Sequence, residues 1–170
     1  MDAVTVDRAK TALERALYAD PDLYAYAVVD GAQNPELPAI LSRRKAGHHC
    51  LFVGDLDREV AAVAPYLVPL PEDSDLLDFL FHEGWGRRWA IYLTSPRKIL
   101  DLRKHMRTLT LAEMPDGETV FFRFYDPSAL RSILPLLTDH QRSLFFGREA
   151  VASFYCEGED PGEVLQFPAG

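Results

Sequence analysis

Four aromatic residues and one arginine occupy positions 121 to 125, within the segment Val120-Phe121-Phe122-Arg123-Phe124-Tyr125-Asp126-Pro127. Aromatic and β-branched residues favour β-strands. An aspartate followed by proline favours the start of a helix, because the carboxylate caps free backbone N–H groups and proline fits the first helical position. The segment therefore predicts a strand that runs directly into a helix at Asp126 and Pro127.

Side chains alternate along a strand, so Arg123 should share one face with Phe121 and Tyr125, while Phe124 and Asp126 point to the other face. An arginine among aromatic residues is costly unless its charge is paired. We therefore expect a carboxylate or a row of backbone carbonyls beside Arg123. Two interpretations are open: a central strand with one structural ion pair, or a junction between the core and a binding surface.

The rest of the chain alternates between helix-like and strand-like segments. Apolar spacing and capping residues predict helices at 6–18, 35–45, 74–82, 95–107, 127–137 and 138–147. Further strands are expected at 23–29, 49–53, 66–70, 89–93, 109–112 and 150–156, and the prolines that bracket residues 66–70 favour an edge strand there. This alternation predicts an α/β (α+β) fold, a single domain with a mixed β-sheet flanked by helices and a helical C-terminal part. We expect the domain to span residues 1–156 and residues 157–170 to form a flexible acidic tail.

Composition limits the function classes. The 170 residues carry a net charge of −8, which argues against nucleic acid as a partner, because nucleic-acid binding needs a basic surface. The sequence has no run of about 18 apolar residues, so we expect no membrane span. Residues Met1 to Val4 do not resemble the start of a signal peptide, and the two cysteines are far apart without a CxxC motif. These features together predict a cytoplasmic protein.

Signatures of enzymes are mostly absent, so we expect neither an enzyme nor a cofactor. The sequence has no nucleophile elbow, phosphate-binding loop, dinucleotide-binding motif or HExxH motif. His48 and Cys50 would share one face of a strand, and a Cys–His pair can act as a nucleophile or bind a metal. The alternative function is therefore a small hydrolase or ligand-binding domain that uses His48, Cys50 and Asp30.

Charged residues at three places are candidates for binding. Asp30, Asp55 and Asp126 each end an expected strand, where carboxylates serve turns and helix caps more often than Mg²⁺. The expected helix that contains Arg103 and Arg107 is basic in an acidic protein. It is either a surface for an acidic partner or a solvated helix face. The aromatic residues are numerous, so we expect most in the core and a few at an exposed apolar surface.

Several spaced motifs resemble the type VI secretion effector adaptors, also called effector chaperones (the Tap/Tec family). The motifs are Tyr26-Ala27-Val28-Val29-Asp30-Gly31-Ala32, Leu51-Phe52-Val53-Gly54, Ala64-Pro65-Tyr66-Leu67-Val68, His105-Met106-Arg107, Phe122-Arg123-Phe124-Tyr125-Asp126-Pro127 and Leu144-Phe145-Phe146-Gly147. They occur in the family's order and cover residues 24–147. Ala64 replaces the usual glycine, and Ser128 stands where arginine is common.

This resemblance implies a cytoplasmic, non-enzymatic adaptor that binds a toxic effector and helps to load it onto the VgrG spike without being secreted. The partners would be the effector and VgrG. We expect an apolar binding groove framed by charges near the strand-to-helix junction and the turns at Asp30 and Asp55. The candidate partner-binding residues are Arg123, Tyr125, Asp126, Pro127, Phe124, Asp30, Asp55, Arg103 and Arg107.

Overall fold

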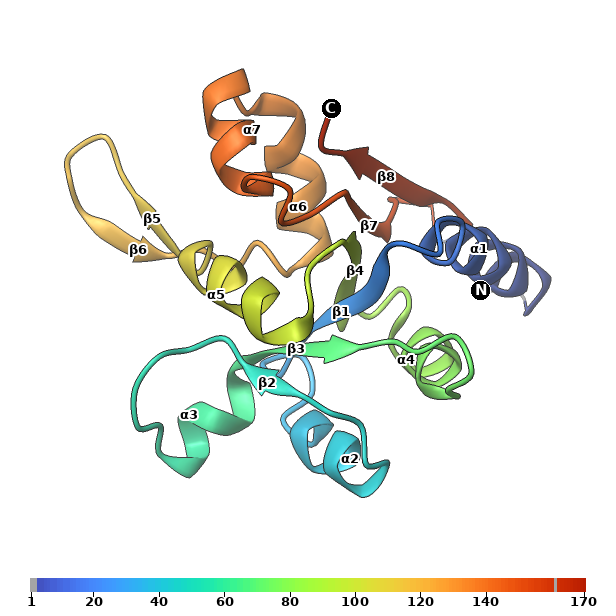
Figure 1. Ribbon diagram of the computed structural model, residues 1–170. Coiled ribbons are helices and arrows are strands. Elements are labelled where there is room, and N and C mark those ends of the chain that lie inside the picture. Colours follow the sequence, from blue (N-terminus) through green and yellow to red (C-terminus); the bar gives the residue numbers. More distant parts are fainter. Residues whose placement is uncertain (1–2, 161) are drawn as a thin grey trace.

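The computed structural model describes residues 3–160 and 162–170, and it places one β-sheet between two layers of helices (Figure 1). The strands lie in the order β2 (His49–Cys50), β3 (Pro65–Pro69), β1 (Tyr24–Asp30), β4 (Ala90–Ser95), β7 (Ser153–Glu157) and β8 (Val164–Pro168). A separate hairpin consists of β5 (Leu111–Glu113) and β6 (Thr119–Phe121). The expected α/β fold is confirmed. Met1, Asp2 and Pro161, which the expected domain and tail include, lie outside the described residues.

The two faces of the sheet are covered by different helices (Figure 1). The first face packs against α1 (Ala3–Leu17), α2 (Leu37–Arg43) and α4 (Leu76–Gly84). The second face packs against α5 (Ile99–Thr108), α6 (Pro127–Ile133) and α7 (Asp139–Phe146). Alternation along β1 sends Ala27 and Val29 into the first core and Tyr26 and Val28 into the second, and all four are buried. A central strand that is buried on both faces reads as a continuous apolar run, as residues 25–29 do.

The expectation of a mixed sheet is corrected in one respect: the pairs among the described strands are antiparallel. A helix between two strands usually indicates a parallel crossover. Here α4 does join two strands with the same direction, β3 and β4, but β1 lies between them and runs the other way. The crossover therefore creates no parallel neighbours.

The expected edge strand at 66–70 lies inside the sheet instead. β3 pairs with β1 on one side and with the two-residue strand β2 on the other. Proline is tolerated here because Pro65 and Pro69 are the first and last residues of β3. The position next to β2 could not be read from the prolines alone.

The aromatic segment is shorter as a strand than expected. β6 ends at Phe121, and a turn follows in which the Asp126 N–H donates to the Arg123 carbonyl over 3.0 Å. The turn allows Phe124 and Tyr125, which are neighbours in sequence, both to enter the core. The start of α6 is confirmed, because Asp126 caps the helix by accepting from the Ser128 N–H.

The segment expected to be a flexible acidic tail contains a strand of the sheet. β8 pairs with β7: Ser153 lies opposite Pro168 at one end of the ladder, and Glu157 lies opposite Val164 at the other end. Leu165 and Phe167 contact the second core. Hydrogen bonds from the Ala169 N–H to the Ala152 carbonyl and from the Gly158 N–H to the Glu163 carbonyl flank the pairing. The apolar residues at alternate positions thus favour a strand in this segment, although its composition is acidic. The same register turns the backbone groups of Val164 and Gln166 away from β7.

Candidate partner-binding site

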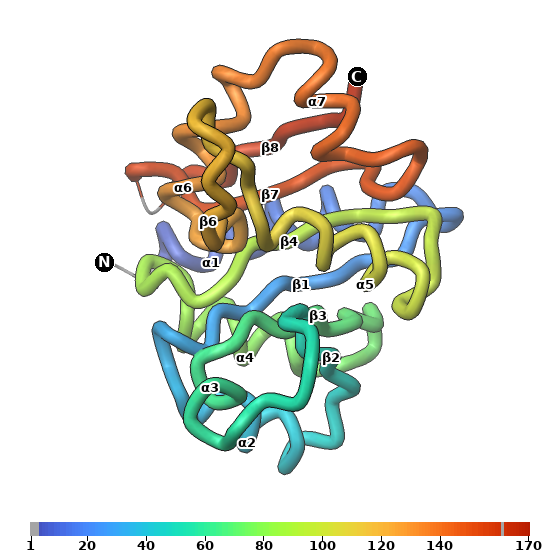
Figure 2. The backbone as a smooth tube through the Cα atoms, turned by 90° about the vertical axis from the view of Figure 1, so that its left-hand side faces the viewer, coloured from blue at the N-terminus to red at the C-terminus, as the bar shows by residue number. Residues whose placement is uncertain are grey.

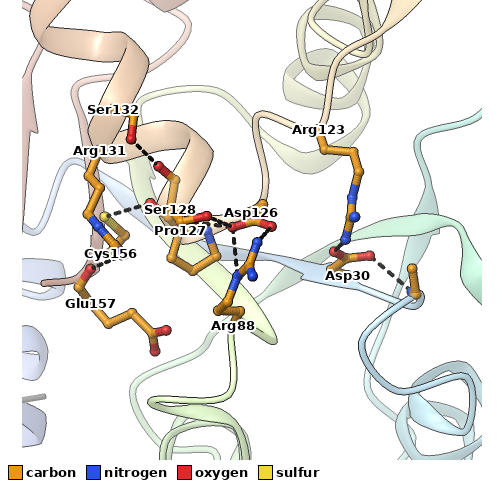
Figure 3. A network of polar contacts seen from close by, with 11 residues as sticks. Asp30, Arg88, Arg123, Asp126, Pro127, Ser128, Arg131, Ser132, Cys156 and Glu157 are labelled. Atoms are coloured by element: carbon orange, nitrogen blue, oxygen red, sulfur yellow. Dashed lines mark hydrogen bonds and ion pairs between the residues drawn. The ribbon is translucent and has the colours of Figure 1, made fainter. Parts of the chain in front are cut away.

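A network of charged side chains lies where several strands end (Figure 3). Asp30 ends β1 and Glu157 ends β7, while Arg88 lies two residues before the start of β4. Antiparallel pairing brings these three strand ends together, because β1 and β7 flank β4 on either side. Arg123 and Asp126 reach the same place from the turn that follows β6.

Arg123 forms an ion pair with Asp30, which confirms the expected carboxylate partner. The Asp30 side chain is completely buried, whereas the Arg123 side chain is 45% exposed. The other Asp30 oxygen, Oδ1, accepts a hydrogen bond from the Ala32 N–H over 3.0 Å, so Asp30 also forms the turn that its sequence predicts. The guanidinium group therefore neutralises a buried charge and still presents N–H donors to the surface.

Arg88 binds Asp126 with two nitrogens, one of them Nε at 3.1 Å from Oδ1. Asp126 also accepts from the backbone N–H and the hydroxyl of Ser128, both at 2.8 Å. Burial alone would raise the pKa of Asp126, but the hydrogen bonds from Arg88 and Ser128 outweigh burial and hold this pKa below its usual value. Sequence reasoning missed Arg88, because a partner 38 residues away leaves no local pattern.

Glu157 is the third buried carboxylate in this region. Burial raises the pKa of Glu157, although the backbone N–H groups of Gly86 and Arg88 both donate to its carboxylate. Arg131 lies close but donates to the backbone carbonyl of Glu157, over 3.5 Å. The Glu157 charge is therefore less well matched than those of Asp30 and Asp126.

Replacing Glu157 with glutamine is expected to raise the free energy of unfolding by about 1 kcal/mol at neutral pH, because the amide oxygen keeps the Gly86 contact without a buried charge. Since the folded-state pKa is raised, the wild-type penalty is complete above the folded-state pKa, declines as the pH falls from the folded-state to the unfolded-state value, and is absent below the latter. Urea unfolding from pH 7 to pH 4 measures the difference. The exposed neighbour Glu159, changed to glutamine, is the control, and an equal gain in both variants would contradict the assignment.

Three expected contact residues lie in the core instead. Phe124, Tyr125 and Pro127 are buried, and Phe124 packs edge-on against Phe145 at 6.0 Å between ring centroids. Burial raises the pKa of the Tyr125 hydroxyl to about 12. These side chains support the turn from inside and are not at the surface. Asp126 is also buried, so Arg123 is the exposed member of this group.

Arg103 and Arg107 do not project freely into solvent. The Arg103 Nε donates to the carbonyl of Cys50 over 3.0 Å, and Arg107 donates to the carbonyl of Phe52 over 3.1 Å. Cys50 is in β2, so α5 uses its basic side chains to satisfy backbone acceptors at that border of the sheet. This contact was not among the two interpretations of the basic helix.

Of the three residues of the alternative function, His48 and Cys50 both lie beside Tyr66, as expected, whereas Asp30 lies apart from them. Cys50 packs with the first core, on the side of the sheet that Tyr66 faces, and the His48 ring lies edge-on to Tyr66 at 5.5 Å. Asp30 points to the opposite face and is paired with Arg123, because it is one residue out of phase with Val29. Within residues 3–160 and 162–170, no group of three His, Cys, Asp or Glu side chains is placed to bind a metal.

Aromatic residues are mostly buried, and the two exposed ones are Tyr24 and Phe121. Phe121, at the end of β6, is 73% exposed, and its ring contacts the ring of Phe52 at 5.5 Å between centroids. Phe121 is two residues from Arg123, so an apolar ring and a half-exposed guanidinium lie close together. Asp55 is exposed in the loop between β2 and α3 (Arg58–Val63), just beyond Phe52.

Comparisons with known proteins give one result for this chain. A family model described as "Domain of unknown function (DUF4123)" matches residues 25–144. The match includes β1 to β6 and the ion pairs of Arg123 and Arg88, whereas β7 and β8 lie beyond it. No curated protein and no solved structure matches the chain significantly. In the described part of the chain, no helix combines the length and apolar character needed to cross a membrane.

Proposed function

The chain belongs to the family described as Domain of unknown function (DUF4123), which is associated with type VI secretion, and we propose from this that it is an effector adaptor. In this proposal the protein binds a toxic effector in the cytoplasm and helps to load it onto the VgrG spike. It stays behind when the effector is secreted, and it makes or breaks no covalent bond. The family match over residues 25–144 is the observation that carries the proposal.

The geometry of the site supports protein binding. Arg123 and Arg88 are about half exposed, and their aspartate partners fix both guanidinium groups in place. Pre-ordered arginines beside an exposed aromatic ring, here Phe121, are typical of residues that dominate protein–protein binding energy. An arginine that is already held in position loses less side-chain entropy on binding.

The proposal predicts that the protein co-purifies with a type VI effector and with VgrG from its native host. Mass spectrometry of the purified complex identifies these partners. Deleting the gene is expected to reduce secretion of that effector at least tenfold, because unbound effector is not loaded. In the wild-type strain, the protein itself should stay in the cell fraction. Restoring the gene should restore secretion. Normal secretion of the co-purified effector in the deletion strain would contradict the adaptor role.

A further inference from the structure

Six exposed apolar side chains lie on two segments of the chain, residues 52–63 and residues 111–121, which we call the hairpin–loop face. They are Val53, Val60, Val63, Leu111, Met114 and Phe121. Figure 2 views the molecule from the side on which the β5–β6 hairpin and α3 both lie. Helix α3 buries none of its own side chains, so its valines are available at the surface. Clustered exposed apolar residues mark interaction surfaces.

The two segments meet at one aromatic contact, and an ion pair lies next to it. The rings of Phe52 and Phe121 are in contact at 5.5 Å. Just beyond Phe121, Arg123 pairs with Asp30, and the next residue, Gly31, donates its N–H to the Ala64 carbonyl over 3.1 Å at the end of α3. The ring contact therefore joins the base of the hairpin to the loop that follows β2.

The charges of this face have one dominant sign. Six exposed carboxylates lie on the two segments: Asp55, Asp57, Glu59, Glu113, Asp116 and Glu118. The same segments contain a single basic residue, Arg58. Two arginines border the face: Arg123 is paired with Asp30, and Arg107 donates to the backbone carbonyl of Phe52 over 3.1 Å. Apolar side chains on the hairpin–loop face are thus accompanied by an excess of negative charge.

We propose that the hairpin–loop face binds a basic amphipathic segment of the partner protein, with apolar side chains packed around Phe121 and lysine or arginine side chains opposite the carboxylates. Complementary charge raises the association rate and sets the register, whereas the desolvated aromatic anchor supplies most of the affinity. This inference rests on the proposed function in one respect, which is that the partner is the effector.

Synthetic helical peptides of about 18 residues test this chemistry directly. The first peptide has leucines at helical spacing with lysines elsewhere, the second replaces each lysine with glutamate, and the third has the first composition in scrambled order. Fluorescence anisotropy is expected to show binding of the first peptide, weakened by salt, and at least tenfold weaker binding of the other two. Equal binding of the lysine and glutamate peptides overturns the inference.

Matched variants locate the contact. The Phe121→Ser variant is expected to bind the lysine peptide at least tenfold more weakly, and the triple variant D55N/E59Q/E113Q about tenfold more weakly. The controls are Leu144→Ser, an exposed leucine on α7, and D22N/E72Q/D73N, which removes three exposed charges beyond the opposite ends of β1 and β3. The controls should change binding less than about twofold. An equal loss of peptide affinity in the variants of the hairpin–loop face and in the control variants overturns the inference.

The same variants separate this inference from the proposed function. An effector that co-purifies equally well with wild type and with D55N/E59Q/E113Q overturns the binding face but leaves the adaptor role intact. Failure to recover any type VI component refutes the adaptor role, while the peptide assay still tests the face. Light scattering tests whether a second copy of this chain occupies the hairpin–loop face. A wild-type dimer that the Phe121→Ser substitution converts to a monomer overturns the inference.

Discussion

The Arg123→Ala variant is expected to unfold with a free energy about 2–4 kcal/mol lower than that of the wild type. Its partner Asp30 is completely buried and keeps a single backbone donor, the Ala32 N–H, when the guanidinium is removed. Removing one member of a buried ion pair leaves an uncompensated charge, which costs more than the pair itself contributes. Because the Arg123 side of the pair is half exposed, the expected loss is below that of a fully buried pair. Urea denaturation measures this loss, provided that the dependence of the unfolding free energy on urea concentration has the same slope in both proteins.

Two further variants make this expectation specific. Arg88→Ala removes a similarly exposed arginine, but Asp126 keeps the Ser128 N–H and hydroxyl, so the expected loss is about 1–2 kcal/mol. Adding Asp30→Asn to Arg123→Ala removes the buried charge and should recover part of the loss. If both arginine variants lose the same stability and Asp30→Asn recovers nothing, the buried charge is not the cause.

The Gly31→Ala variant is expected to lose about 3 kcal/mol of stability. A Cβ atom at position 31 would lie 2.5 Å from the Ala62 carbonyl oxygen and 2.6 Å from the Ala64 carbonyl oxygen. Both atoms belong to the backbone, so relief requires a shift of the end of α3 against β1 and weakens the Gly31 N–H bond to Ala64. For a chain of this length, the expected decrease in melting temperature is roughly 10 °C.

Gly47→Ala is the matched control for this prediction. A Cβ atom at position 47 would meet the Pro69 side chain at 3.7 Å, an ordinary van der Waals distance. Replacing a glycine where the backbone tolerates alanine restricts the unfolded chain, so this variant should be neutral or slightly stabilising. A Gly31→Ala melting temperature within about 2 °C of Gly47→Ala would contradict the close approach.

The sequence predicted those features that depend on neighbouring residues. Asp126 caps α6 as its Asp-Pro motif indicates, although α6 ends at Ile133, short of the expected 137, and the 3₁₀ helix Leu134–Leu136 follows. The type of partner for Arg123 was also predictable, because a cation among aromatic residues must be neutralised. Its identity as Asp30 was not, since the two residues are 93 positions apart.

Tertiary contacts decided the remaining features of the candidate site. Phe124 and Tyr125 enter the core because a turn replaces the expected strand, and α5 directs Arg103 and Arg107 toward the carbonyls of β2 and the residues after it. A sequence pattern gives the polarity of such side chains but not the element that will lie beside them. The structure therefore gives Phe124 and Tyr125 a place in the core, and it gives Arg103 and Arg107 contacts with backbone carbonyls.

The two borders of the sheet have different capacities for adding a strand. At the β2 border, guanidinium groups of α5 already occupy the carbonyl of Cys50, so an incoming chain meets competition for that acceptor. At the β8 border, Val164 and Gln166 present both N–H and C=O outward, while the Arg142 guanidinium occupies the Pro168 carbonyl and proline offers no donor. Fibrils grown by successive strand addition need two receptive borders, and this sheet has one short receptive border and one obstructed border.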